Sequence, residues 1–371
     1  MKKDTRNACA VKTSIGGQAL MEGIMMRGPH KTAMAVRNTK GEIVIEEIEP
    51  KTAKRPNFCK WPIIRGVFGF IDSMTLGYKC LMRSAELSGL EDLVEESPKK
   101  KQKRLKKEAT QSAEAPSQEA ETVVENATET EQKAEKAEGE AEEKKLPAWA
   151  MTLMMIVSIL IAVVFMVGLF FFAPTYLYEL LSKHLRFFQN PNPILNSLIK
   201  SAFEGIFKIL LLVGYMAAIS LMKDIRRTYM YHGAEHKTIF CYEAGLELTV
   251  ENVRKQRRFH PRCGTSFLIL MLLVGVFISF FIDPVSIAIL GHKLPNLWRV
   301  CVRILLFPLV MGIGYELIKL AGKHDNLFTR ILSAPGMGLQ HLTVLEPTDD
   351  MIECAIEAVT RVIPEDGSDR I

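Results

Sequence analysis

The segment HGAEH, at positions 232–236, places two histidines and a glutamate at a spacing that suits metal chemistry. In a helix, His232 and His236 are four residues apart and face the same way, with Glu235 beside His236. The pattern HxxEH is the inverted form of the zinc-protease helix, in which two imidazoles bind the metal and the glutamate polarises a water molecule. The alternative is a pair of solvated histidines, because short patterns recur by chance and Gly233 weakens a helix.

A second pair of possible ligands follows in the same stretch of chain. His260 and Cys263 form an HxxC pair, and Glu243 lies eleven residues after His232, on the same face of a helix. A catalytic zinc usually has three protein ligands and an open position, whereas four protein ligands make a closed structural site. The spacing of these residues leaves both kinds of site open.

A glycine-rich segment near the amino terminus, GGQALMEGIMMRGPH, is the other unusual stretch of the sequence. Its glycines surround Gln18, Glu22, Arg27 and His30, among large apolar residues. Glycine permits a close approach of the backbone, either to a ligand or to another helix. The segment lacks the Lys-Ser/Thr ending of a phosphate-binding loop, so packing against a membrane bundle is favoured slightly over ligand binding.

Apolar segments that are long enough to cross a bilayer surround these motifs. A helix needs roughly 20 apolar residues to cross the hydrocarbon core, and lipid excludes unpaired strands. We therefore expect four transmembrane helices, within Pro147–Tyr178, Phe203–Met222, Phe267–Ile282 and Trp298–Leu320. If the second helix continues into the HGAEH segment, His232 lies about 15 Å beyond its apolar part, near the lipid headgroups.

Lysine and arginine residues gather on one side of these predicted spans. They lie just before the first span, just after the second and just before the third, whereas the loop 174–200 carries only three. The positive-inside rule then puts both termini and the loop 223–265 in the cytosol, in a multi-pass protein of the cell membrane. No removable signal peptide is expected, and seven scattered cysteines without a CxxC pair favour a reducing compartment.

Local patterns predict three further elements outside the spans. Alternating residues in TAMAVR and EIVIEEIE, joined at Asn38–Gly41, predict a β-hairpin. Apolar residues at helical spacing after Pro62 predict an amphipathic helix, whose glycines indicate either close packing or a break. Thr348 begins a predicted short amphipathic helix that Pro364 would end.

The fold class predicted is a membrane α-helical protein, with about four transmembrane helices and a small cytosolic α+β portion made of the N-terminal β-hairpin and amphipathic helices. Residues 1–96 form the N-terminal cytosolic or membrane-skimming region, and residues 97–146 form a charged linker that is too polar to fold. The four-span domain is 147–322, with the cytosolic metal-site loop 223–265 inside it. Residues 323–371 form a C-terminal cytosolic helical segment.

Charge gives limited information about partners. The net charge of +5 arises largely from basic residues beside the spans, where anionic lipid explains them, so membrane lipid is expected as a partner and nucleic acid is not. The basic run KKKQKRLKK either binds anionic lipid or is a solvated linker. We expect the charges within the spans to pair or to reach the interface, rather than to carry transport. These charges are Glu204, Lys208, Arg299, Arg303 and Glu316.

Four segments together resemble one known family. GGQALMEGIMMRGP, HGAEHKTI, RFHPRCGTSF and PGMGLQHLTVLEPTDDMIECAIEAV occur in the order found in the YqhQ family, bacterial membrane proteins for which a metal-dependent enzyme activity is conjectured. The similarity covers about 14–92 and 149–363, and it implies a protein of the bacterial cytoplasmic membrane. Carried over by motif, the implied site residues are His232, Glu235, His236, His260, Cys263, Glu22 and Arg27.

Two functions fit these motifs best. The first is a metal-dependent hydrolase, using a divalent metal that we expect to be zinc, which acts at the cytosolic membrane face on a membrane-associated peptide, lipid or lipid-linked substrate. In it, His232 and His236 bind the metal, Glu235 is the general base, and His260 or Cys263 completes the site. The second is a non-enzymatic membrane scaffold or assembly factor, in which these residues hold a structural metal.

A third function, a transporter, would depend on the charges within the spans. Arg303 and Glu316 would then matter more than the loop histidines, and four spans per chain would require a homo-oligomer. The sequence identifies neither the substrate nor the metal.

Overall fold

The computed structural model describes residues 11–49, 56–89, 148–185, 188, 191–324 and 326–370. The chain divides into two compact units, Leu93–Phe172 on the one hand and Met1–Asp92 with Ala173–Ile371 on the other. The strands are β1 (Gly16–Leu20), β2 (Gly23–Arg27), β3 (Thr32–Arg37) and β4 (Ile43–Ile48). The helices are η2 (Asn57–Lys60), α1 (Ile64–Leu87), α5 (Ala148–Val167), η3 (Gly168–Phe172), α6 (Ala173–His184), α7 (Pro193–Ile219), α8 (Lys223–Glu243), α9 (Val250–Arg254), α10 (Gly264–Leu290), α11 (Asn296–Leu305), α12 (Phe307–Lys323), α13 (Leu327–Thr343) and α14 (Asp349–Val362). The linker predicted at 97–146 lies outside the described residues.

The four strands form one antiparallel sheet in the order β1-β2-β3-β4. The predicted hairpin is present as β3 and β4, where Arg37 pairs with Ile43. The Asn38 side chain accepts hydrogen bonds from the backbone N–H groups of Lys40 and Glu42, which closes the turn. The glycine-rich segment, in contrast, forms the two strands β1 and β2, which the sequence did not predict.

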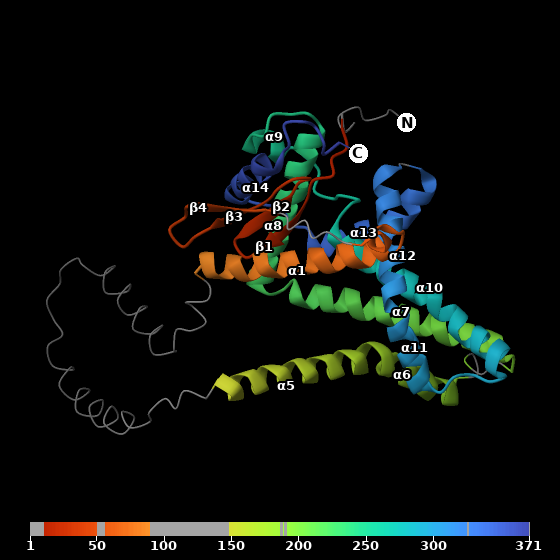
Figure 1. The fold of residues 1–371 in the computed structure, drawn as a ribbon. Coiled ribbons are helices and arrows are strands. Elements are labelled where there is room, and N and C mark those ends of the chain that lie inside the picture. Colours follow the sequence, from red (N-terminus) through yellow and green to blue (C-terminus); the bar gives the residue numbers. More distant parts are fainter. Residues whose placement is uncertain are drawn as a thin grey trace, which may run out of the picture. The chain divides into compact units, whose positions relative to one another are not determined.

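Both faces of this sheet are buried, which explains why its first strands carry no alternating pattern. Ile24, Met26, Ala33 and Ala35 face the core formed with α8 and α14. The other face, with Leu20, Met25, Met34 and Val36, packs against α1 around Cys80. Figure 1 shows α8 and α14 on one side of the sheet and α1 on the other. Strands buried on both faces are continuously apolar, so hydrophobic periodicity does not reveal them.

The helix α1 confirms the predicted amphipathic helix and runs without a break through its glycines. A Cβ atom on Gly66 would lie 2.8 Å from the Tyr315 side chain, so this glycine lets α1 approach α12 closely. Arg65 is anchored to the same helix, since its Nε and Nη2 donate to the Glu316 carboxylate at 2.7 and 2.5 Å. Close packing, the first of the two readings of these glycines, is therefore correct.

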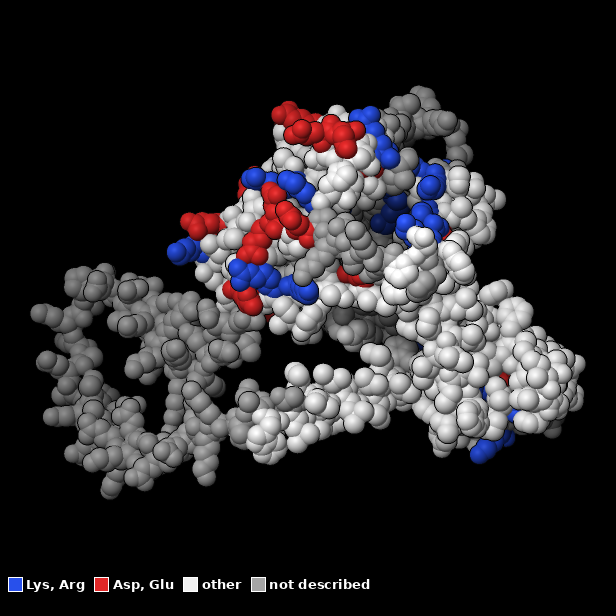
Figure 2. Space-filling view, in the orientation of Figure 1, with Lys and Arg blue, Asp and Glu red and all other residues white. Residues whose placement is uncertain are grey.

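A bundle of α7, α10, α12 and α13 adjoins the sheet layer within the larger unit. Leu212, Ile269 and Leu339 join α7, α10 and α13, while Leu270 and Val310 join α10 and α12. In the view of Figure 2, charged side chains gather over the sheet and α14, and few lie over the bundle.

Three stretches of helix among the described residues are long and apolar enough to cross a membrane, and a fourth is a bent pair. The three are Leu153–His184, Pro193–Ile219 and Gly264–Leu290. The pair α11 and α12, bent by 46°, makes the fourth if it counts as one span. These helices indicate membrane association, at the four places expected from the sequence. The predicted orientation and the cytosolic termini stay predictions.

The chain turns between the second span and the HGAEH segment. The helix α7 ends at Ile219, and Met222 has an extended backbone (φ −73°, ψ 132°) that redirects the chain into α8. A continuous helix from the span through His232 is therefore not formed, because α8 packs on the sheet instead. The C-terminal prediction is confirmed: α14 begins directly after Thr348 and ends at Val362, two residues before Pro364. The helix α13 was not predicted.

Candidate metal centre

The helix α8 carries His232 and His236 into the interior of the larger unit. A Cβ atom on Gly233 would lie 1.9 Å from the Leu345 carbonyl oxygen, so glycine is required where the helix meets the segment after α13. The Leu345 N–H donates to the Tyr229 carbonyl at 2.9 Å at the same contact. Gly233 thus serves packing, and the helix forms despite its low propensity.

Three of the predicted ligands come together at one point. Single ligand atoms of His232, His236 and Cys263 all lie within 4.8 Å of one another. His232 Nε2 lies 3.0 Å from Cys263 Sγ, and the imidazole rings of His232 and His236 are 4.4 Å apart between centroids. Two imidazoles and a thiolate are a ligand set that divalent transition metals such as zinc accept.

Backbone carbonyl groups hold both histidines from behind. His232 Nδ1 lies 2.9 Å from the Thr343 carbonyl oxygen, and His236 Nδ1 lies 2.6 Å from that of Arg258. Because a carbonyl only accepts hydrogen bonds, each Nδ1 must carry the proton and each Nε2 keeps a lone pair in the neutral ring. Such outer hydrogen bonds typically orient the histidine ligands of metal sites. His236 Nε2 is buried and has no hydrogen-bond partner among the described residues.

The third residue, Cys263, precedes the first turn of α10 as its N-cap. Burial raises the pKa of its thiol, but His232 and His236 outweigh burial and hold this pKa well below its ordinary value. For His232, burial disfavours the imidazolium, yet Cys263 raises the imidazole pKa to about 9. The start of a helix also favours a thiolate, which is the form of cysteine that binds metals.

Glu235 lies beside the three ligands, with only 5% of its surface exposed. The backbone N–H of Gly17, in β1, donates to its carboxylate, while its Oε2 atom lacks a hydrogen-bond partner in the described part of the chain. Burial is the main cause of its raised pKa, to which Cys263 adds. A Cβ atom on Gly17 would lie 3.0 Å from the Glu235 Cδ atom, so the glycine allows β1 to contact the carboxylate.

His260, the fourth predicted ligand, lies outside the three-residue group. Its ring is 5.6 Å from that of His236, and its Nδ1 accepts the Arg262 N–H at 3.2 Å. Its Nε2 lies 3.7 Å from Glu243 Oε2. The carboxylate of Glu243, a further possible ligand in the sequence, also pairs with Arg262 and accepts the Thr13 N–H at 2.9 Å. His260 and Glu243 therefore form a second layer behind the group.

Burial and these neighbours shift the pKa values of the second layer. Burial lowers the pKa of His260 to about 4, so the ring is neutral near pH 7. Burial opposes the ionisation of Glu243, but His260 and Arg262 lower its pKa to about 2. The second layer thus presents a neutral imidazole and a carboxylate that is already paired.

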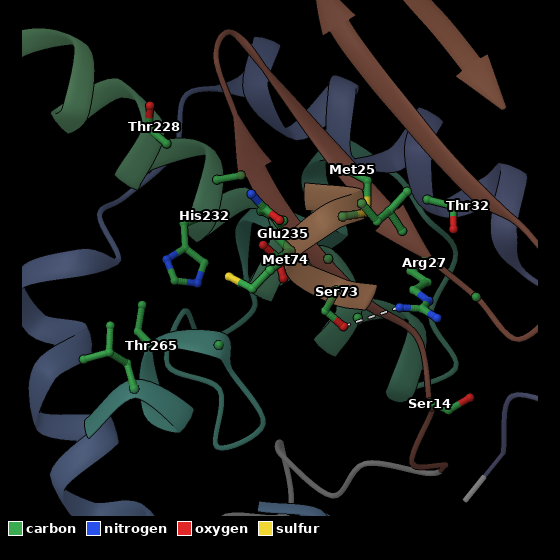
Figure 3. Close-up of a pocket in the computed structure, with 18 of the residues that line it drawn as sticks. Ser14, Met25, Arg27, Thr32, Ser73, Met74, Thr228, His232, Glu235 and Thr265 are labelled. Atoms are coloured by element: carbon green, nitrogen blue, oxygen red, sulfur yellow. Dashed lines mark hydrogen bonds between the residues drawn. The ribbon is translucent and has the colours of Figure 1, made fainter. Parts of the chain in front are cut away.

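Glu22 and Arg27, the two candidates carried over from the family motif, lie at different places. Glu22 occupies the turn between β1 and β2, with φ at 50°, and accepts hydrogen bonds from Arg227 Nε and Nη2, both at 2.5 Å. It does not line the cavity beside the ligands. Arg27 does line this cavity, and its Nη1 lies 3.5 Å from Ser73 Oγ (Figure 3).

A cavity of about 770 Å³ opens beside the ligand group. Its walls come from β1, β2, α1, α8 and the start of α10, and Figure 3 shows the side chains of His232 and Glu235 within it. A molecule in this cavity can therefore reach a metal ligand and a carboxylate at once. The site therefore combines residues that could bind a metal, a buried carboxylate and a cavity.

Two residues of α13, Gln340 through its side chain and Thr343 through its backbone, complete the site, and neither was predicted. The fully buried Gln340 accepts the His260 N–H at 2.9 Å and donates to the His260 carbonyl at 2.7 Å. Thr343 supplies the carbonyl that holds His232. The motif PGMGLQHLT contains both residues, so the only signal for them was its resemblance to the family.

Comparisons with known proteins agree with that resemblance. A family model described as "Protein of unknown function (DUF1385)" matches residues 61–365. The "Uncharacterized protein YqhQ" of Bacillus subtilis (strain 168) is 33% identical over 358 residues, which is 95% of this chain and 93% of the relative. No solved structure matches the chain. The resemblance to YqhQ is confirmed, and the chain belongs to the family described as protein of unknown function (DUF1385).

Proposed function

We propose that this protein is a metal-dependent hydrolase, using zinc, that acts at the cytosolic face of a cell membrane. The observation that carries the proposal is the convergence of His232, His236 and Cys263 within 4.8 Å, beside the buried carboxylate of Glu235. A buried imidazole nitrogen without a partner is costly unless something binds it. A metal ion held by these three residues would give His236 Nε2 the partner that it lacks among the described residues.

The number of grouped ligands supports a catalytic site over a structural one. Structural zinc sites usually close with four protein ligands, whereas catalytic sites use three and leave one position for water or substrate. His260, the residue that would supply a fourth ligand, lies outside the group: its Nδ1 accepts the Arg262 N–H, and its Nε2, which has no hydrogen-bond partner among the described residues, lies 3.7 Å from Glu243 Oε2. The scaffold alternative, which needs a closed site, is therefore less well supported.

Glu235 is the residue best placed to act as the general base. Its carboxylate is buried beside the ligands and lines the cavity, and its raised pKa brings it closer to the range in which a base works well near pH 7. A bound zinc ion would supply Lewis acidity, which activates a water molecule near neutral pH. Glu235 would take one proton from the attacking water, whose oxygen bonds to the acyl or phosphoryl centre. The bond from that centre to the leaving group then breaks, and the leaving group keeps the electron pair and receives the proton from Glu235.

The position of the site within the fold supports a membrane-associated substrate. Residue Ile219 ends α7 just before α8 begins, and Cys263 directly precedes α10. Both α7 and α10 are apolar enough to span a membrane. Cys263 therefore lies at the start of one candidate span, and His232 and His236 lie on α8, the helix that follows the other. A substrate held at the membrane surface is within reach of such a site. The excess of basic residues on this side supports the cytosolic face.

The separation of 3.0 Å between His232 Nε2 and Cys263 Sγ also favours a second candidate function. A thiolate–imidazolium pair at hydrogen-bond distance is the arrangement of cysteine nucleophiles. That reading leaves the second histidine, His236, without a role for its buried Nε2 atom. Metal binding explains both histidines, so we favour it.

Metal analysis of the full-length protein, purified in detergent without chelators, tests the proposal. Elemental mass spectrometry should find about one zinc ion per chain in the wild type and in Glu235→Gln. His236→Ala and Cys263→Ala should lose it, whereas His324→Ala, an exposed histidine outside the group, should keep it. Cobalt loaded in place of zinc should show a thiolate charge-transfer band that Cys263→Ser removes.

Catalysis needs its own measurement. Zinc-loaded protein in nanodiscs, incubated with a bacterial lipid extract, should release products that mass spectrometry detects and that Glu235→Gln reduces by about 100-fold or more. Wild-type protein without any bound metal would refute the metal proposal. Activity that resists chelators but is lost when Cys263 is alkylated would instead establish the cysteine nucleophile.

A further inference from the structure

A second cavity, of about 630 Å³, reaches the ligand group from the side of the bundle. Glu235, His236 and Cys263 line it, and so do residues of α1, α10 and α12. It shares Ser73, Met74 and Glu235 with the 770 Å³ cavity, so the two cavities meet beside the ligand group. The ligand group is therefore open to a second cavity, which differs from the first in the residues that line it.

The walls of this second cavity are largely apolar, and part of them belongs to the candidate spans α10 and α12. Phe267 and Met271 line it from α10, and Tyr315 and Ile318 line it from α12. Met271 lies eight residues beyond Cys263, which is about 12 Å along the helix towards its apolar middle. Phe70 of α1 adds an aromatic ring, 5.5 Å from that of Phe267. A cavity that follows a span in this way is suited to a hydrocarbon chain.

Two lysines also line the same cavity. Lys319 and Lys323 are exposed residues of the last turns of α12, four residues apart and so on one face of the helix. Cations at this position attract an anionic group at the membrane surface, at about 1 kcal/mol for each lysine. The cavity therefore combines an apolar channel, two cations and the proposed metal ligands.

The helix α1 offers an apolar surface next to the opening. Ile71, Met74, Tyr78 and Met82 lie on one face and are exposed by 48, 53, 64 and 41%. Of these, Met74 also lines the cavity. An amphipathic helix with such a face lies in the interface between lipid headgroups and acyl chains. The lipid phase would then extend to the wall of the cavity.

We propose that the substrate is an anionic amphiphile of the bilayer, whose apolar chain occupies the second cavity and whose acidic headgroup binds Lys319 and Lys323. The bond to be hydrolysed then lies beside Glu235, and the polar product leaves through the 770 Å³ cavity. This inference rests on the proposed function, because the amphiphile is a substrate only if the protein is a hydrolase. Binding of the amphiphile can be tested without measuring any activity.

The test is photolabelling of the full-length protein in phosphatidylcholine nanodiscs. A trace of phosphatidylglycerol with a diazirine in its acyl chain is irradiated, and mass spectrometry maps the labelled residues. Labels are expected on Phe70, Phe267, Met271 or Ile318. Each Lys→Gln change at 319 or 323 should reduce them about fivefold. A phosphatidylcholine probe should label these residues much less.

Two controls separate the cavity from the surrounding lipid. Phe277 and Phe281 of α10, exposed by 62 and 53%, should be labelled equally by both probes and by all variants. Gly69→Leu places a larger side chain in the cavity wall, where a Cβ atom lies 3.6 Å from the Tyr315 ring at ordinary contact distance. This variant should fold and lose the cavity labels only.

The two proposals fail in different ways. Labels confined to Phe277 and Phe281, or unchanged by the lysine variants, overturn the lipid inference even if zinc is bound. That result would favour a peptide substrate lying along β1 in the other cavity. Cavity labelling that persists in a protein without metal would support the lipid site while the hydrolase proposal fails.

Discussion

Two buried polar clusters in this protein differ in how their charges are matched. The bundle cluster consists of Glu204, Asp283, Arg299 and Arg303, all buried between candidate spans. Arg303 pairs with Glu204, and Arg299 Nε lies 3.1 Å from Asp283 Oδ1. Each carboxylate also accepts a hydroxyl hydrogen bond, from Thr175 and from Ser197. Pairing, one of the two outcomes predicted for charges within the spans, is confirmed for Glu204, Arg299 and Arg303, whereas Asp283 was not predicted. The cluster joins α6, α7, α10 and α11.

The ligand cluster, formed by His232, His236, Cys263 and Glu235, is arranged differently. No lysine or arginine pairs with Glu235 among the described residues, whereas each charged side chain of the bundle cluster has an oppositely charged neighbour. Buried polar atoms without a hydrogen-bond partner occur in both clusters, at His236 Nε2 and Glu235 Oε2 in the ligand cluster and at Arg299 Nη2 and Arg303 Nε in the bundle cluster. Two cavities open onto the cluster, at His232 and Glu235 on one side and at His236 and Cys263 on the other. Matched charges hold helices together, whereas unmatched lone pairs beside a cavity favour binding and chemistry.

Arg303→Leu should have the largest effect, and it should affect stability alone. Removing one partner of a buried ion pair costs about 3–5 kcal/mol when the other charge is left alone. Arg299 Nη1 lies 3.8 Å from Glu204 Oε1 and keeps part of the compensation, so a loss near the lower end of this range is expected. The variant should unfold at lower temperature or denaturant in detergent, followed by tryptophan fluorescence or circular dichroism. Zinc per folded chain should not change, because the bundle cluster has no contact with the ligand group.

The double variant Glu204→Gln with Arg303→Leu is the matched control. It removes both charges and keeps a side chain that accepts the Thr175 hydrogen bond, so it should recover part of the lost stability. If Arg303→Leu lowered the zinc content of folded protein, the separation of the two clusters would be wrong.

Glu243→Gln should have the next largest effect, and it should depend on pH. The native pKa of Glu243 is lowered to about 2, so its carboxylate stabilises the fold above its unfolded pKa of 4.5, and this contribution is lost as the pH falls from 4.5 towards 2. The variant should be about 2–3 kcal/mol less stable near pH 7, from lost charged hydrogen bonds to Arg262 and Thr13.

Thermal unfolding of wild type and Glu243→Gln at about pH 7 and about pH 3 measures this dependence. The difference between the two proteins should shrink at the lower pH, because Glu243 in the unfolded wild type binds a proton there while the native carboxylate, with its pKa of about 2, remains largely ionised. A difference of equal size at both pH values would show that the side chain acts through packing and not through charge.

The spacing of apolar residues identified the bundle more completely than the sheet. Candidate spans and α14 follow from hydropathy and from Thr348 at a helix start, and the hairpin of β3 and β4 follows from alternation. The strands β1 and β2 were missed because α1 covers one face of the sheet and α8 and α14 cover the other. Their apolar residues therefore lack the period of two that marks a half-exposed strand.

The sequence predicted the residues that come together at the candidate site, but not the groups that hold these residues in place. Spacing alone put His232, His236 and Glu235 on one helix and Cys263 close by. The carbonyl groups of Thr343 and Arg258 that orient the rings leave no trace in side-chain type, so the chemistry of the side chains did not reveal them. Packing also decided that His260 faces Glu243, since a spacing pattern does not fix where a ring points.

Gly17→Ala should have the smallest effect on stability, but it should act on the ligand cluster specifically. The added Cβ atom would lie 2.7 Å from the Met25 carbonyl oxygen and 3.0 Å from Glu235 Cδ, so the strand or the carboxylate must shift. Such overpacking typically costs about 1–2 kcal/mol. Activity should fall by more than the stability loss explains, with zinc still bound, because β1 orients the base and not the ligands.

Gly16→Ala is the matched control, since a Cβ atom there meets nothing within 4 Å. Equal effects of the two changes on activity would mean that β1 does not position Glu235.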